Sequence, residues 1–145
     1  MPTASKGKTK SPFSKEELKK WRALLVQKRA EITQDIKDLV KDAMDAEDGH
    51  HAPTHAADRG SDVDFQEMTL GMVGNEEELL WQIDRAIEKI DTAKPAPFGI
   101  CEYSKQPIPK TRLKLLPWTP ISIEGATYME QNKLSLEDLL SEDDL

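Results

Sequence analysis

Hydrophobic residues recur every seven positions in two long stretches of the chain. The first row is Leu18, Leu25, Ile32 and Leu39, and the second row is Phe65, Met72, Leu79 and Ala86. A repeat of this kind gathers apolar side chains on one face of a helix, and that face needs another helix to cover it. Because a stretch rich in glycine, proline and histidine separates the two rows, the sequence predicts a long antiparallel coiled-coil hairpin over residues 14–91.

The two ends of the first helix are marked in the sequence. Ser14 and Glu17 have the spacing of a capping box, which begins a helix. We expect the helix to continue to about Asp48. The segment 49–64 then contains glycine, proline and aspartate, so it is predicted to form the turn at the tip of the hairpin.

The second helix is predicted to begin at Asp62 or Asp64 and to end at Asp91. Gly71 and Gly74 lie within it, and glycine weakens a helix by about 1 kcal/mol relative to alanine. We therefore expect these two glycines to permit a close approach of the first helix or a local bend.

The chain then has the spacing of a small zinc finger without its ligands. Cys101 lies where a Cys-x-x-Cys pair would begin, but Ser104 holds the partner position, and Ser122 and Gly125 hold the positions of the second pair. A structural zinc site needs four ligands such as thiolates and imidazoles. The sequence therefore predicts a metal-free knob in which apolar side chains replace zinc. Cys101 could be a reactive thiol, but no arrangement that stabilises a thiolate can be read from the sequence, which favours a buried remnant.

The structure of the remaining segments is predicted from their composition. Residues 92–133 are predicted to form the knob, ending in a short helix over 126–133. Residues 1–13 are expected to be a disordered basic tail, and residues 134–145 an acidic tail that is frayed rather than docked as a helix. The expected fold is thus mainly α and has a single domain.

Charge and composition exclude several classes of protein. The net charge of −7 argues against a nucleic-acid duplex as the main partner, because phosphate binding needs clustered Lys and Arg. A single cysteine is consistent with a reducing compartment, and no apolar run reaches membrane-spanning length. No nucleophile–base pair or phosphate-binding glycine loop is recognisable. We expect a cytoplasmic, monomeric protein that is not an enzyme and does not bind a specific nucleic-acid sequence or a membrane.

The histidines of the tip leave two interpretations open. His50, His51 and His55 are close in sequence, as metal ligands often are, but three histidines in a loop with glycine and proline are more often solvated. The function of this loop is not assigned by the sequence.

Three segments of the chain together resemble the DksA/TraR family of bacterial transcription regulators. They are the tip HAADRGSD with the following DFQEMTLG, the return helix EEELLWQIDRAIEKI, and the finger FGICEYSKQPIPKTRLKLLPWTPISI. The positions that keep the finger pattern of the family are Gly99, Cys101, Ile108, Arg112, Leu113 and Pro117. Ser104, Ser122 and Gly125 depart from it.

The resemblance implies a partner and a mode of action. Family members bind RNA polymerase by inserting the hairpin into its secondary channel, where acidic residues at the tip modulate initiation. By position, those residues are Asp58 and Asp62, with Asp64 as a weaker third. A competing hypothesis is a repurposed coiled-coil module that binds another protein, or itself, and no longer engages RNA polymerase.

Some family members also help to form a site for guanosine tetraphosphate, using basic residues of the finger and the final helix. Lys110, Arg112 and Lys114 are the basic residues available here, but the C-terminus is acidic. The sequence therefore favours a protein without a cofactor.

Overall fold

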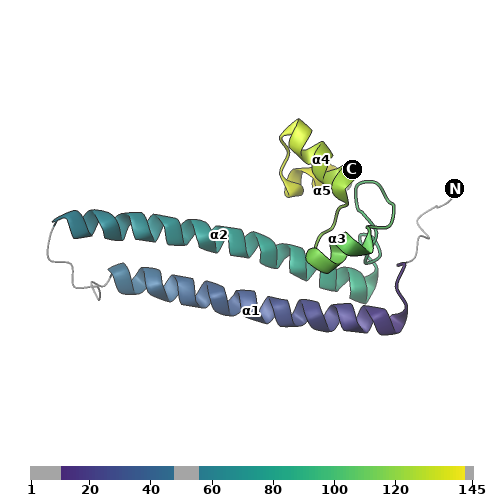
Figure 1. Ribbon diagram of the computed structural model, residues 1–145, viewed down its shortest axis with the longest axis horizontal. Coiled ribbons are helices and arrows are strands. Elements are labelled where there is room, and N and C mark those ends of the chain that lie inside the picture. Colours follow the sequence, from purple (N-terminus) through teal and green to yellow (C-terminus); the bar gives the residue numbers. More distant parts are fainter. Residues whose placement is uncertain (1–10, 48–55, 143–145) are drawn as a thin grey trace. The chain divides into compact units, whose positions relative to one another are not determined.

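The computed structural model describes residues 11–47 and 56–142. The helices are α1 (Lys15–Glu47), α2 (Ala56–Thr92), α3 (Lys110–Leu115), α4 (Ile123–Asn132) and α5 (Leu136–Glu142) (Figure 1). Within these residues the β-type pairing is one isolated bridge, between Ile100 and Pro107. The prediction of a mainly α fold with a helical hairpin is confirmed.

The chain divides into two compact units. Residues 27–81 form the first, here called the hairpin unit, and the residues before 27 and after 81 form the second, here called the knob unit. Each unit contains part of α1 and part of α2, so the chain leaves the knob unit once and returns to it once.

The capping box at the start of α1 is confirmed. The backbone N–H of Ser14 donates to Oε1 of Glu17 at 3.0 Å, and the N–H of Glu17 donates to Oγ of Ser14 at 3.2 Å. The hydrogen bonds with Ser14 hold the pKa of Glu17 below its ordinary value. This exchange satisfies two backbone donors that a helix N-terminus otherwise leaves without partners.

The hairpin unit has a narrow core. Among its described side chains, Ile32 and Thr69 are fully buried and most of the others at the helix contact are half-buried. The side chain of Gln66 on α2 donates to the backbone carbonyl of Ala43 on α1 at 3.2 Å. Met72, expected in the packed heptad row, is instead 45% exposed.

The second helix differs from its prediction in two respects. It begins at Ala56 instead of Asp62 or Asp64. Gly60, which was expected to belong to the turn, lies within the helix. Gly71 and Gly74 are exposed, and a Cβ added at either position would meet nothing within 4 Å. The expectation that these two glycines permit a close helix approach is therefore wrong.

Thr69 offers a direct test of the hairpin core. Its Oγ1 is buried without a hydrogen-bond partner among the described residues, and an unsatisfied buried hydroxyl is costly. We expect Thr69→Val to raise the free energy of unfolding by about 1 kcal/mol, measured by urea denaturation followed by circular dichroism. The control is Thr33→Val, which removes an exposed hydroxyl bonded to the carbonyl of Arg29 at 2.8 Å. A Thr69→Val variant that is less stable than the wild type would contradict the expectation.

The knob unit contains most of the buried apolar side chains. Phe13, Trp21 and Phe98 form a three-ring cluster with centroid distances of 5.5 to 5.8 Å. Gly99 has a φ of +91°, and a Cβ at this position would lie 2.8 Å from the Phe13 ring. Only glycine therefore fits between the ring cluster and the finger loop.

The C-terminal segment is a docked helix, so the expectation of a frayed acidic tail is wrong. α5 begins with reciprocal hydrogen bonds between Ser135 and Asp138. Leu136, Leu139 and Leu140 are each less than 8% exposed. Their spacing places them on one helical face, and burial of that face outweighs the repulsion among the nearby acids.

Candidate functional site

The acidic residues of the predicted tip lie in the first turns of α2. Positions 58 and 62 are one helical turn apart in the backbone, and Asp64 is exposed. The side chains of Asp58 and Asp62 lie outside the part of the structure that is described. The histidines at 50, 51 and 55 also lie outside the described residues, so the two interpretations of that loop stand as stated.

The knob brings three of the four zinc-ligand positions together around one sulfur atom. The Sγ of Cys101 accepts hydrogen bonds from the backbone N–H of Ser104 at 3.3 Å and the backbone N–H of Ser122 at 3.2 Å. The hydroxyl of Ser122 donates to the same sulfur at 3.4 Å. The finger geometry is thus kept, with hydrogen-bond donors where ligands would be.

These residues do not fit a zinc ion. The set provides one thiolate, and the serines that face it act as donors rather than as ligands. At the fourth position, a Cβ on Gly125 would lie 3.0 Å from Cβ of Ile121 and 3.2 Å from Cβ of Tyr103. The space for a side chain at position 125 is therefore filled by apolar neighbours. Across the described residues, no group of three or more His, Cys, Asp or Glu is placed to hold a metal.

The same hydrogen bonds favour the ionised form of Cys101. Burial raises the pKa of the thiol, but the hydrogen bonds from Ser104 and Ser122 outweigh it and bring the pKa below the usual value. Cys101 is buried, as expected, but the hydrogen bonds around its sulfur could not be read from the sequence. Sequence reasoning missed them because two of the three donors are backbone N–H groups, which no residue type reveals.

A buried ion cluster connects α2 to the finger loop. The guanidinium of Arg85 forms hydrogen bonds of 2.6 to 3.1 Å to both carboxylate oxygens of Glu102. The Nζ of Lys89 donates to Oε2 of Glu102 at 3.1 Å. Lys89 and Glu102 are each 3% exposed. Sequence reasoning missed the cluster, although a glutamate directly after Cys101 in an apolar stretch is a usable signal.

The ion cluster keeps its carboxylate ionised. Burial raises the pKa of Glu102, but the hydrogen bonds and charges of Arg85 and Lys89 outweigh it, so the pKa falls below the ordinary value. Burial lowers the pKa of Lys89, and the attraction of Glu102 offsets only part of that change. Arg85 and Lys89 thus share the carboxylate of Glu102.

Two of the three basic residues of α3 contact other residues of the knob unit. The Nε of Arg112 donates to the carbonyl of Ile121 at 3.0 Å. The Nζ of Lys110 lies 5.8 Å from the centroid of the Phe13 ring, a distance at which a cation and an aromatic ring attract each other. Lys114 is exposed. Two of these three cations thus have a structural role in the knob.

No helix in the described part of the chain combines the length and the apolar character needed to cross a membrane.

The structure is similar to solved protein structures. One is the transcription factor DksA2 from Pseudomonas aeruginosa, with 26% identical residues and a TM-score of 0.67. The match covers 81% of this chain and 86% of that one. No protein-family model matches the chain, and no curated protein sequence matches it. The similarity therefore extends over most of both chains.

Proposed function

We propose that this chain, which belongs to the DksA/TraR family of transcription regulators, binds RNA polymerase and modulates initiation by inserting its hairpin into the secondary channel. The observation that carries the proposal is the match to a transcription factor over 81% of the chain. Proteins of this family are regulators without catalytic activity, and this chain is accordingly not an enzyme.

The acids at the start of α2 supply the chemistry of the proposal. Carboxylates are hard oxygen donors that suit Mg²⁺, and a polymerase active centre depends on that ion. Asp58 and Asp62 stand one helical turn apart, so both can approach the same centre when the hairpin enters the channel. Asp64 is assigned a weaker role.

The test is a titration of the protein against bacterial RNA polymerase core enzyme, together with transcription assays with the holoenzyme on a set of promoters. We expect the double variant Asp58→Asn, Asp62→Asn to bind with nearly the wild-type dissociation constant and to lose its effect on transcription. The control variant Glu77→Gln, Glu78→Gln removes two exposed acids from the same helix and is expected to keep both properties. A tip variant that regulates as the wild type does would refute the role of these acids.

A second function is supported by exposed apolar side chains on the hairpin unit. Met44, Val63 and Leu70 are 57%, 53% and 63% exposed, and such side chains suit contact with another helix. In this alternative the hairpin binds another protein, or a second copy of the chain, and not the polymerase. Absence of polymerase binding, with self-association in sedimentation, is the outcome that selects it.

A further inference from the structure

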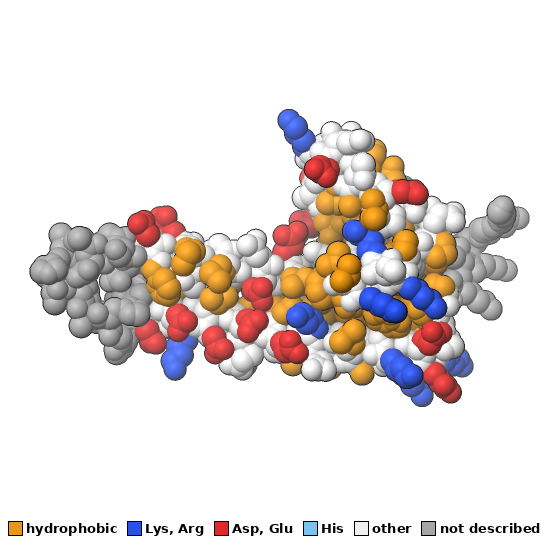
Figure 2. Space-filling view, viewed as in Figure 1, with side chains coloured by type: hydrophobic (Ala, Val, Ile, Leu, Met, Phe, Trp, Pro, Cys, Tyr) orange, Lys and Arg blue, Asp and Glu red, His pale blue; other side chains and the backbone are white. Residues whose placement is uncertain are grey.

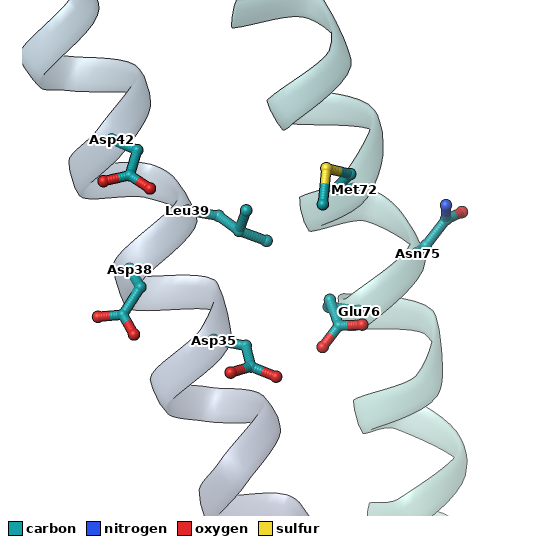
Figure 3. A pocket seen from close by; sticks show the side chains of 7 residues that line it. All are labelled: Asp35, Asp38, Leu39, Asp42, Met72, Asn75 and Glu76. Atoms are coloured by element: carbon teal, nitrogen blue, oxygen red, sulfur yellow. The ribbon is translucent and has the colours of Figure 1, made fainter. Parts of the chain in front are cut away.

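An open groove lies between α1 and α2 within the hairpin unit. Leu39 and Met72 point toward each other across it and provide its apolar floor (Figure 3). The groove has a volume of about 450 Å³, within the range of pockets that hold a bound group. Met72, 45% exposed, presents a flexible apolar side chain to it.

Carboxylates form the rim of this groove. The polar residues that line it are Asp35, Asp38 and Asp42 from α1 and Asn75 and Glu76 from α2. Figure 3 shows Asp35 and Glu76 pointing toward each other from opposite helices. In the described part of the chain, the carboxylates of Asp35, Asp42 and Glu76 have no ion pair or side-chain hydrogen bond. Like charges thus line both sides of the groove, and none of these three carboxylates is paired with a Lys or Arg of the described residues.

The rim belongs to a longer acidic stripe on α1. Acids occur at Glu31, Asp35, Asp38, Asp42 and Asp45, a spacing of alternately four and three residues. This spacing keeps them on one side of the helix over about 21 Å. Residues 27–81 contain 14 Asp and Glu against five Lys and Arg. On the face that Figure 2 shows, acidic and hydrophobic side chains lie next to one another in this unit.

The chemistry of the groove restricts its occupant. The described acids are not grouped to hold a metal ion, and a negative stripe repels nucleic acid. An apolar floor with an acidic rim suits a polypeptide whose Lys and Arg side chains reach the carboxylates along their aliphatic stems. An apolar side chain of the same segment then covers Leu39 and Met72, as when an amphipathic helix fills a hydrophobic groove.

We infer that this groove binds a basic segment of RNA polymerase, in which Lys or Arg recurs every three to four residues and one apolar side chain packs on Leu39 and Met72. The inference rests on the proposed function and deepens it. It assigns the affinity for polymerase to the acidic side of the hairpin, while the effect on transcription is assigned to Asp58 and Asp62.

The first experiment measures the dissociation constant for RNA polymerase core enzyme at a series of salt concentrations. The groove variant is Asp35→Asn, Asp38→Asn, Asp42→Asn. The matched control is Glu67→Gln, Glu77→Gln, Glu78→Gln, which removes three exposed acids of the same unit that do not line the groove. We expect the groove variant to bind about tenfold more weakly or worse at low salt, with a flatter salt dependence, and the control to stay near wild type. Circular dichroism confirms that both variants are folded.

The outcomes separate this inference from the proposed function. If the wild type binds polymerase and the groove variant binds equally well, or no worse than the control, the inference is wrong and the proposed function stands. If the wild type does not bind, both are wrong. If the wild type self-associates in sedimentation and the groove variant does not, the occupant of the groove is a second copy of the chain. The inference is then also wrong.

The second experiment identifies the segment that occupies the groove. Cys101 is fully buried and is the chain's one cysteine, so Asn75→Cys places an accessible thiol at the groove rim. A thiol-directed photo-cross-linker at this position is expected to capture a polymerase peptide rich in Lys and Arg. The control variant Glu78→Cys carries the same reagent outside the groove. Capture of an acidic peptide, or the same peptide from both positions, would overturn the inference.

Discussion

Replacement of Glu102 by glutamine is expected to destabilise the knob unit by about 3–5 kcal/mol, because it leaves Lys89 and the guanidinium of Arg85 without their carboxylate. Urea denaturation followed by tryptophan fluorescence measures the loss. The double variant Glu102→Gln, Lys89→Met is expected to recover part of it, since one buried cation is then removed.

The control for this variant is Asp91→Asn, which breaks the Arg22–Asp91 pair of the same unit. That pair has good geometry, with N–O distances of 2.8 and 3.0 Å, but both side chains are almost half exposed, so its loss is expected to be small. The pH dependence of stability gives a second readout for Glu102→Gln. Because the pKa of Glu102 is lowered on folding, its contribution is present above the ordinary glutamate pKa and is lost as the pH falls through the folded value. Glu102→Gln should remove that acid sensitivity. Equal losses for the two variants would contradict the role of the cluster.

Replacement of Phe98 by alanine is expected to cost about 3–5 kcal/mol. Phe98 is 2% exposed and packs on both Phe13 and Trp21, and its carbonyl accepts a hydrogen bond from the hydroxyl of Ser11 at 2.6 Å. The variant is expected to lose the packing of residues 11–13 on the knob, and Trp21 is a fluorescent reporter of that change. Thermal and urea unfolding measure the stability.

The matched control for Phe98 is Tyr103→Ala. Tyr103 stacks on Tyr128 with a centroid distance of 4.9 Å but is 36% exposed, so its removal creates less of a cavity and a smaller loss is expected. If Tyr103→Ala costs as much as Phe98→Ala, the ring cluster is not the main anchor of the N-terminal segment.

The features that the sequence predicted correctly are those determined by neighbours along the chain. The exchange between Ser14 and Glu17 depends on residues three apart, and the packing of Leu25 and Ile32 follows from the heptad repeat. Local rules were sufficient in each case.

Other features depend on what a residue meets in three dimensions. The heptad row predicted that Met72 packs between the two helices. Its actual exposure depends on how the two helices face each other, and the exposed side chain lines the groove. The acids around Leu136, Leu139 and Leu140 suggested a frayed tail, although the leucine spacing of three and four indicated a buried face. The charged residues Arg85, Lys89 and Glu102 meet only after α2 and the finger loop have packed together.

The division of the chain has a consequence for how such a protein changes during evolution. The knob unit is assembled from both ends of the chain, since Phe13 and Trp21 pack on Phe98 and since Arg85 and Lys89 bind Glu102. Residues 27–81 enter and leave that unit as one insertion. Removing or adding whole heptads in both helices would preserve the packed rows and leave every knob contact intact. The length of the hairpin unit can therefore change without a change in the contacts within the knob unit.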